Sequence, residues 1–219
     1  MDDGKVENSM NILAIETSLP HASLCLCRDA NIAFQTEWKT ERNHDEWLFP
    51  ALQKAMELLN DASLDIILVG AGPGSYGGVR VALAAAVGIA QVSGASVAAL
   101  CSWSQLAETG AVVVSDARRG GWTMRRENGN IDVVSTEELK HLQEEGVRIL
   151  TIEAPEAMQT KGISPDSGRL QPTAAGLVQT WLDMSLDEQT AALNAPAEPI
   201  YVRPPHITKA VHKPWEIRR

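Results

Sequence analysis

The sequence feature that most constrains the fold is a glycine-rich segment that joins two apolar stretches. Residues 65–70 (DIILVG) form a short β-branched apolar run, which predicts a buried strand. Residues 70–78 follow with five glycines and one proline. Residues 79–93 carry small and branched apolar side chains on nearly every side and stop before Gly94, which predicts a largely buried helix.

The glycine segment has two interpretations. Glycine lets the backbone adopt positive φ and come close to another group. Backbone amides at the start of a helix can also cradle an anion, helped by the helix dipole. The segment therefore predicts either a phosphate loop or a tight turn against which another chain packs. The candidate phosphate-loop residues within it are Gly72, Gly74, Ser75, Gly77 and Gly78.

Two common phosphate motifs do not fit this segment. Gly72, Gly74 and Gly77 match G-x-G-x-x-G, but a dinucleotide site also needs an acid about 20 residues further on to hold the ribose. Residues 97–100 are apolar, and the next acid is Glu108. The Walker A motif needs a Gly-Lys-Ser/Thr ending, which is absent. Both readings are excluded.

Composition limits the class of protein. A chain of 219 residues corresponds to one large domain or two small ones. A formal net charge of −9 predicts weak attraction to nucleic acid for the chain as a whole. No apolar run approaches the ~20 residues of a membrane span, and no secretory leader is visible. We expect a cytoplasmic protein without a membrane segment, in which residues 1–9 are a disordered extension.

Cysteine usage fits a reducing compartment, since the chain has three cysteines. Cys25 and Cys27 alternate with leucines in an expected strand and share one face of it. A Cys-x-Cys pair can bind metal, but no second pair exists. We expect these cysteines to be small core residues.

The first half of the chain predicts a mixed sheet. Three short stretches at 11–17, 22–28 and 32–39 are joined by turn-forming links, which indicates an antiparallel meander. A helix is expected at 45–60, and a strand at 97–100 comes after the glycine segment. Antiparallel strands followed by parallel strands with crossover helices predict a five-stranded sheet with helices on its faces.

The second half repeats the βββαβα pattern in a shorter form, without a second glycine loop. This indicates an internal duplication, with one domain at 10–108 and a reduced domain with a basic tail at 109–219. The remaining expected elements are strands at 111–116, 121–126, 131–134 and 147–153, helices at 102–108, 136–145 and 173–184, and a loop-rich stretch at 154–172.

The glycine segment, GPGSYGGVR at 72–80, resembles the GPGSFTGVR loop of the TsaB (YeaZ) family. The resemblance extends from residue 11 to about 209, with ILAIETS at the start, VSDAR at 114–118 and PIYVR before the tail. Tyr76 and Gly77 stand where the family has Phe and Thr, and the second change removes a hydroxyl. The resemblance implies an α/β fold of two ribonuclease-H-like halves (βββαβα) of the actin/Hsp70/sugar-kinase superfamily, with the second half reduced.

The resemblance also implies a function. Family members accompany TsaD, which transfers a threonylcarbamoyl group to N6 of adenosine 37 in tRNA. The chain is then expected to be a non-catalytic scaffold that docks on TsaD, assists the ATPase TsaE, forms a homodimer when alone and meets tRNA only through the complex. No cofactor is expected for this chain alone, and ATP and Mg²⁺ enter only in the assembled complex. The absent second glycine loop and the short second half independently favour a non-catalytic role.

Acidic residues at two expected strand ends are the candidate chemical groups. In active members of the superfamily, an acid in the place of Glu16, followed by Thr17, lies near the nucleotide γ-phosphate. Asp116 takes the matching place in the second half. Two acids facing each other across a cleft would suit a metal–nucleotide site. An acid followed by Thr-Ser is also an ordinary turn, and we favour that interpretation.

His44 at the start of the 45–60 helix is a candidate metal ligand. TsaD-like relatives carry two histidines four residues apart on this helix, and such a pair can chelate a metal. Here Leu48 occupies the second position, so no metal is expected. The expected role of His44 and Asp45 is helix capping.

The helices at 45–60 and 79–93 are candidate partner surfaces. In the resembling family these two helices pair with the same two of a second copy or of TsaD. Small residues recur every four positions and allow close helix approach. Packing on the chain's own sheet must account for one face of each helix. The candidate interface residues are Leu48, Leu52, Ala55, Ala82, Ala86 and Ala90.

Three alternatives stay open from the residues alone. A free-standing ATP-dependent phosphotransferase of the same superfamily is the main one. A peptidase using Ser75, His44 and either Asp116 or Glu16 has no support from spacing. The basic and aromatic tail at 206–219 either contacts tRNA or is a solvated terminus.

Overall fold

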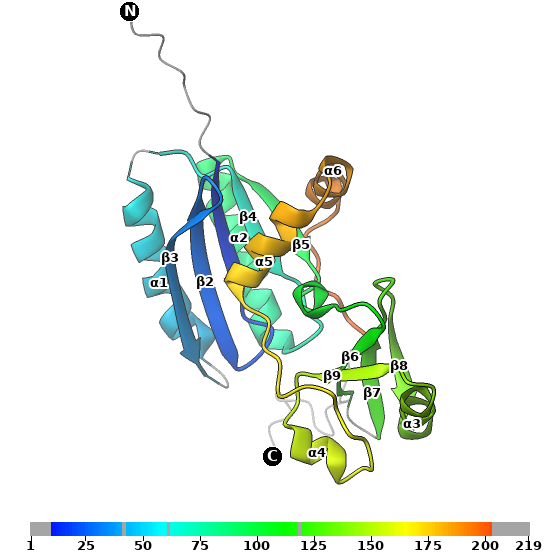
Figure 1. The fold of residues 1–219 in the computed structure, drawn as a ribbon. Coiled ribbons are helices and arrows are strands. Elements are labelled where there is room, and N and C mark those ends of the chain that lie inside the picture. The colour runs from blue at the N-terminus through cyan, green and yellow to red at the C-terminus, as the bar shows by residue number, and fades with distance from the viewer. Residues whose placement is uncertain (1–9, 41–42, 61, 118–119, 203–219) are drawn as a thin grey trace, which may run out of the picture.

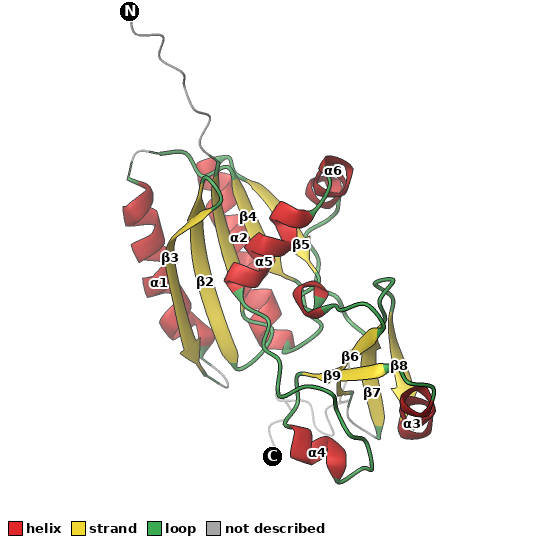
Figure 2. Ribbon diagram, in the orientation of Figure 1, coloured by secondary structure: helices red, strands yellow, loops and turns green. Residues whose placement is uncertain are grey.

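The computed structural model describes residues 10–40, 43–60, 62–117 and 120–202, and it contains two β-sheets with helices packed on them (Figure 1). The larger sheet and its helices come from the first half and the end of the described chain. The smaller sheet comes from the middle (Figure 2). The α/β class predicted from the sequence is confirmed. The expected extension at 1–9 and the basic tail lie outside the described residues.

The larger sheet has the predicted mixed topology. Its strand order is β3-β2-β1-β4-β5, in which β1, β2 and β3 are antiparallel and β4 and β5 run parallel to β1. Short turns allow the meander, whereas the parallel strands need crossover helices. The strands are β1 (Asn11–Glu16), β2 (His21–Arg28), β3 (Asn31–Lys39), β4 (Ile66–Gly70) and β5 (Ser96–Leu100).

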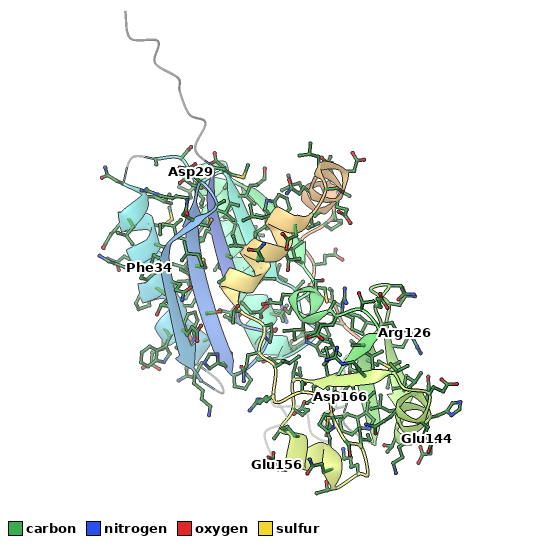
Figure 3. All side chains as sticks on the ribbon, in the orientation of Figure 1. Asp29, Phe34, Arg126, Glu144, Glu156 and Asp166 are labelled. Carbon is green, nitrogen blue, oxygen red and sulfur yellow. The ribbon has the colours of Figure 1, made fainter. Side chains whose placement is uncertain are left out.

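One face of this sheet is covered by α1 (His44–Leu59) and α2 (Tyr76–Ser93). Successive side chains of a strand point to opposite faces, so Leu13 and Ile15 of β1 contact this helical layer. Figure 3 shows the side chains that fill the space between the ribbons. Helix α2 begins three residues before the predicted 79–93 range, because the Ser75 hydroxyl accepts a hydrogen bond from Gly78 N at 3.3 Å and caps its first turn.

Helix α2 is the one helix among the described residues with the length and apolar composition of a membrane span. Ala82, Leu83 and Ala86 on its inner side are buried against the sheet. Packing on the sheet accounts for the apolar character of that side, and the outer side is considered below.

The opposite face of the larger sheet is covered by α5 (Ala174–Asp183), with α6 (Leu186–Asn194) beside it (Figure 1). The sequence predicted the helix at 173–184 as part of the second half. The structure corrects its place: Leu177, Val178 and Trp181 pack on the first sheet, where they meet Cys25 and Cys27. Ala174 N also donates to Ser23 Oγ at 2.8 Å. The cysteines are core residues, as expected, and the domain boundary at 108/109 stays a prediction.

The smaller sheet has the order β8-β7-β6-β9 and contains the predicted hairpin. The expected loop at 154–172 contains a short helix, α4, which Pro155 initiates because its fixed φ suits a first helical turn. The elements of this half are β6 (Ala111–Asp116), β7 (Gly121–Arg125), β8 (Ile131–Ser135), α3 (Thr136–Glu144), β9 (Arg148–Thr151) and α4 (Pro155–Gln159).

Trp103 fixes the junction between the two sheets. It precedes the 3-10 turn η1 (Ser104–Leu106) and is 1% exposed. Its ring packs with Val113, Leu150 and Ile152 of the second half and with Leu19 of the first. This apolar contact positions the strand ends of the two halves opposite each other.

Candidate functional site

The glycine loop packs tightly on the end of β1. A Cβ atom on Gly74 would overlap the carbonyl oxygen of Ser18, and one on Gly78 would overlap that of Thr17. Thr17 Oγ1 donates to the carbonyl oxygen of Gly78 at 2.8 Å. Glycine is required at these two positions because backbone lies where a side chain would be.

Three amides of the loop are engaged inside the protein. Gly72 N donates to Ser102 Oγ at 3.1 Å, Ser75 N to the carbonyl oxygen of Ser18 at 2.6 Å, and Gly78 N to Ser75 Oγ at 3.3 Å. A phosphate cradle needs such amides free to point at the ligand. The geometry therefore favours the tight-turn interpretation of the loop over the phosphate-loop interpretation.

Glu16 lies beneath the loop and is fully buried. Its Oε1 accepts a hydrogen bond from Ser18 N at 2.7 Å, while Oε2 lies against Gly70 and has no hydrogen-bond partner within the described residues. Burial raises the pKa of Glu16 above its ordinary value, and interactions with Ser18 and Ser102 oppose this rise. Because Glu16 is fully buried, its carboxyl group can stabilise the adjacent turn but is not exposed to a ligand.

Asp116 lies in a different environment, at the rim of a cleft of about 850 Å³ between the two halves. It is exposed at the end of β6, and its Oδ2 is 3.6 Å from Lys161 Nζ. Gly74, Ser75 and Gly77 line the same cleft, whereas Glu16, Thr17, Gly72 and Gly78 do not. The expected pair of acids facing across a cleft is therefore not formed, because Glu16 is enclosed by the loop.

The cleft also contains residues that the sequence interpretation missed. Trp103, Glu153 and Tyr201 line its walls. Tyr201 stacks on Tyr76 with ring centroids 5.4 Å apart, and Arg80 lies over the Tyr76 ring at 5.0 Å. These residues come from distant parts of the chain, so no local spacing pattern could have grouped them.

His44 does not cap α1, which corrects the sequence prediction. The N-cap residue is Asn43, and it makes no side-chain capping hydrogen bond. Asp45 lies in the first turn, where its charge complements the helix dipole. His44 is buried with its Nδ1 unpartnered within the described residues, and burial lowers the pKa of its imidazole.

Within the described ranges, His44 is part of neither a three-residue metal-binding group nor a triad with Ser75. Among the described residues, no group of three His, Cys, Asp or Glu side chains is placed to hold a metal ion. Ser75 Oγ is occupied as the α2 cap, and no hydrogen bond joins it to His44 in the described part of the chain. The peptidase reading therefore gains no geometric support.

The residues proposed for the partner interface require a correction. Leu48, Leu52, Ala55, Ala82 and Ala86 are buried against the chain's own sheet, and Ala90 is partly buried there. The helices present different apolar residues to the outside, which we call the outer face of α1 and α2. Its residues are Trp47, Phe49 and Leu58 of α1 with Ala84, Val87, Gly88 and Val92 of α2.

Comparison with known proteins identifies the family. The model of the family "TsaD: tRNA N6-adenosine threonylcarbamoyltransferase" matches residues 38–166, more than half of the chain. The tRNA threonylcarbamoyladenosine biosynthesis protein TsaB of Escherichia coli is 27% identical over 221 residues, covering 89% of this chain and 95% of the relative. TsaB of Bacillus subtilis is 33% identical over 51% of this chain and 52% of its own length.

Other matches extend the comparison. An uncharacterized protein of Mycobacterium tuberculosis is 32% identical over 49% of this chain and 54% of its own length. The solved structure of YeaZ from Pseudomonas aeruginosa superposes with a TM-score of 0.64 at 22% identity, covering 88% of this chain and 99% of that one. A second Pseudomonas aeruginosa structure, described as similar to peptidase YeaZ, gives 0.66 at 21% identity, covering 89% of this chain and all of that one. The chain belongs to the TsaD family of the matching model and, within it, to the TsaB (YeaZ) group.

Proposed function

We propose that the chain is a non-catalytic scaffold subunit for synthesis of N6-threonylcarbamoyladenosine in tRNA, acting in the cytoplasm. Two named relatives are tRNA threonylcarbamoyladenosine biosynthesis proteins, which supports the pathway. TsaD carries out the transfer to adenosine 37, and this chain docks on it and assists TsaE. ATP, Mg²⁺ and tRNA are bound in the assembled complex rather than by this chain alone.

The observation that carries the proposal is the outer face of α1 and α2. Trp47 is 53% exposed, Phe49 56% and Val92 91%. Exposed large apolar side chains on the two helices that cover one face of the sheet can bury further apolar surface against a partner. On α2, Ala84 and Gly88 lie between the larger side chains and permit close approach of a partner helix. The same face would pair two copies of the chain when TsaD is absent.

The internal contacts of the glycine loop support a role without catalysis. Three loop amides, those of Gly72, Ser75 and Gly78, bind groups of the chain itself, and Glu16 is fully buried. The alternative phosphotransferase needs ATP with Mg²⁺ to bind this chain at micromolar strength. Calorimetry with the purified chain tests it directly, and we expect no heat of ATP binding.

The docking proposal is tested by capture of the chain on immobilised cognate TsaD. Ala84→Arg puts a charge on the outer face and is expected to abolish capture while the thermal transition is unchanged. Ala191→Arg places the same charge on an exposed position of α6 and serves as the matched control. Equal capture of the Ala84→Arg variant and the wild-type chain would rule out this face.

Ala86→Arg separates docking from folding. Ala86 is fully buried against the sheet, so this variant is expected to lose its fold, as seen by circular dichroism. A folded Ala86→Arg variant that fails to bind TsaD would mean that the inner and outer faces have been assigned the wrong way round.

A further inference from the structure

The exposed side of α2 changes from apolar to charged near the start of the helix. Four exposed residues follow one another at intervals of four, which places them on one side of the helix. They are Tyr76, Arg80, Ala84 and Gly88. Arg80 is the one charged residue of α2. The outer face of α1 and α2 therefore continues at Arg80 into a single positive charge.

Tyr76 holds the guanidinium group of Arg80 in place. Arg80 Nη1 donates a hydrogen bond to Tyr76 Oη at 2.6 Å, and the guanidinium carbon lies 5.0 Å from the centre of the Tyr76 ring. Tyr201 stacks on the same ring, with the two centroids 5.4 Å apart. A side chain that is fixed before binding loses less conformational entropy when a partner docks. The exposed cation is therefore presented in a defined position.

No carboxylate in the described ranges forms an ion pair with Arg80. By contrast, Arg126 and Arg148 lie 3.4 Å and 2.8 Å from carboxylate oxygens. Arg80 lies about 6 Å along the helix axis from Ala84, so a partner that packs closely on Ala84 also covers Arg80. Covering an unpaired charge is costly, so such a partner must supply an anion at this point.

The anion that fits is a protein carboxylate rather than an RNA phosphate. RNA is bound by several cations along its backbone, and α2 supplies one. The start of α1 lies beside the start of α2, since His44 Nε2 is 3.2 Å from the Cβ position of Gly78. Asp45 and Glu46 in that first turn of α1 are exposed and would repel phosphate. An arginine at the edge of an apolar surface is typical of a protein–protein interface.

We propose that Arg80, positioned by Tyr76, binds a carboxylate on the surface of TsaD that docks against the outer face of α1 and α2. The inference rests on the proposed scaffold function and adds the charge that the docking surface of TsaD carries. Arginine can donate two parallel hydrogen bonds to a carboxylate, so the contact selects a partner with that group at that place. Ala84 and Gly88 set how closely the partner approaches, and Arg80 sets which partner is accepted.

The test measures the affinity of the full-length chain for immobilised cognate TsaD, without tRNA. Arg80→Gln is expected to weaken binding about tenfold and Arg80→Glu about a hundredfold, with unchanged thermal transitions. Lys140→Glu on α3, a helix of the other half of the molecule, changes the net charge by the same amount and is expected to bind as the wild-type chain does (Figure 1). Wild-type affinity in both Arg80 variants, or an equal loss in Lys140→Glu and Arg80→Glu, would overturn the proposal.

Salt distinguishes an ion pair from another kind of contact. The ratio of the dissociation constants of Arg80→Gln and the wild-type chain is expected to decrease as NaCl rises from about 0.05 M to about 1 M, because salt screens the pair that only the wild-type chain can form. A ratio that does not change with salt contradicts the carboxylate contact.

Tyr76→Phe tests the positioning of the guanidinium group. The variant removes the hydroxyl that accepts from Arg80 and keeps the ring that stacks on Tyr201. Binding to TsaD is expected to weaken about threefold in the wild-type background and not to weaken further in Arg80→Gln, because interacting residues are not additive. Equal losses in the two backgrounds would show that Tyr76 does not act through Arg80.

The outcomes separate this inference from the scaffold function on which it rests. Loss of capture in Ala84→Arg together with wild-type affinity in Arg80→Glu would overturn this inference alone. Failure of TsaD to capture the wild-type chain would overturn both. Wild-type affinity of Arg80→Glu for TsaD with slower modification of tRNA would assign Arg80 to RNA and contradict the carboxylate contact.

Discussion

Gly78 and Gly88 lie on the same helix but have opposite surroundings. A Cβ atom on Gly78 would overlap the Thr17 carbonyl, whereas nothing lies within 4 Å of one on Gly88. We predict that Gly78→Ala lowers the free energy of unfolding by about 1–3 kcal/mol, as overpacking does. Gly88→Ala should raise it by about 0.5–1 kcal/mol, because alanine loses less backbone entropy in a helix. Urea denaturation of both variants measures the difference.

The informative result is which of the two variants, Gly78→Ala or Gly88→Ala, is the more stable. If Gly78→Ala is as stable as the wild-type chain, the loop does not pack on β1 as described. The tight-turn interpretation of the glycine segment would then be wrong.

Glu16 predicts a pH dependence of stability. Burial raises the pKa of Glu16 in the folded state above its ordinary value of 4.5. The folded protein then keeps a proton that the unfolded chain has released, so stability falls as pH rises from about 4.5 through the folded pKa. Glu16→Gln removes this fall, because the amide stays neutral and can still accept from Ser18 N. The variant should therefore gain stability relative to wild type as pH rises.

Unfolding free energies of the wild-type chain and Glu16→Gln, measured between about pH 4.5 and about pH 8, test whether the variant gains stability relative to wild type as pH rises. One pKa unit is worth about 1.4 kcal/mol, so the divergence is measurable. His44, whose pKa burial lowers, is present in both proteins and cancels in the difference. Parallel stability curves would show that Glu16 is charged in the folded protein.

At the scale of single elements, Ser75 begins α2 rather than acting as a nucleophile. Its side chain accepts the hydrogen bond from Gly78 N that caps the helix. Ser75→Ala should lower the free energy of unfolding by about 1 kcal/mol, the usual cost of losing a cap. Binding to TsaD should be retained. Peptide cleavage by the wild-type chain that disappears in Ser75→Ala would contradict this role.

Most elements could be predicted from the sequence, because alternation and turn residues define β1 to β3 and the β7–β8 hairpin locally. Helix α6 was missed because its apolar contact with the core is small, mainly Ala192 and Leu193, and does not form a repeated apolar stripe. The outward side of α2 was also misassigned. Its two tracks of small residues, Ala82–Ala86–Ala90 and Ala84–Gly88, are alike in sequence, and only packing on the sheet distinguishes them.

At the scale of the whole molecule, α5 packs on the first sheet, although it follows the second sheet in the sequence. Trp181 is 1% exposed and packs with Leu68 and Ala98 on the face opposite α1 and α2. Trp181→Ala should cost about 3–5 kcal/mol, as for other large core deletions, and destabilise the first sheet. Amide hydrogen exchange of β1, measured at increasing temperature, tests this loss of stability. Undiminished protection of β1 would show that α5 contributes little to its core.

The cleft shows why the site was harder to predict than the fold. Ser18, Trp103 and Glu153 each follow a β-strand, but they meet only because the two halves associate through the Trp103 cluster. Sequence spacing indicates contacts within an element or between consecutive ones. It does not indicate how two sheets pack on each other, nor that Glu16 would be enclosed while Asp116 stays exposed.

The most direct test of the scaffold account is formation of N6-threonylcarbamoyladenosine on tRNA by purified TsaD and TsaE, supplied with their activated substrate. Addition of the wild-type chain is expected to restore modification, and addition of Ala84→Arg is expected to leave the rate at its level without the chain. Equal stimulation by both proteins, or full modification without either, would contradict the account.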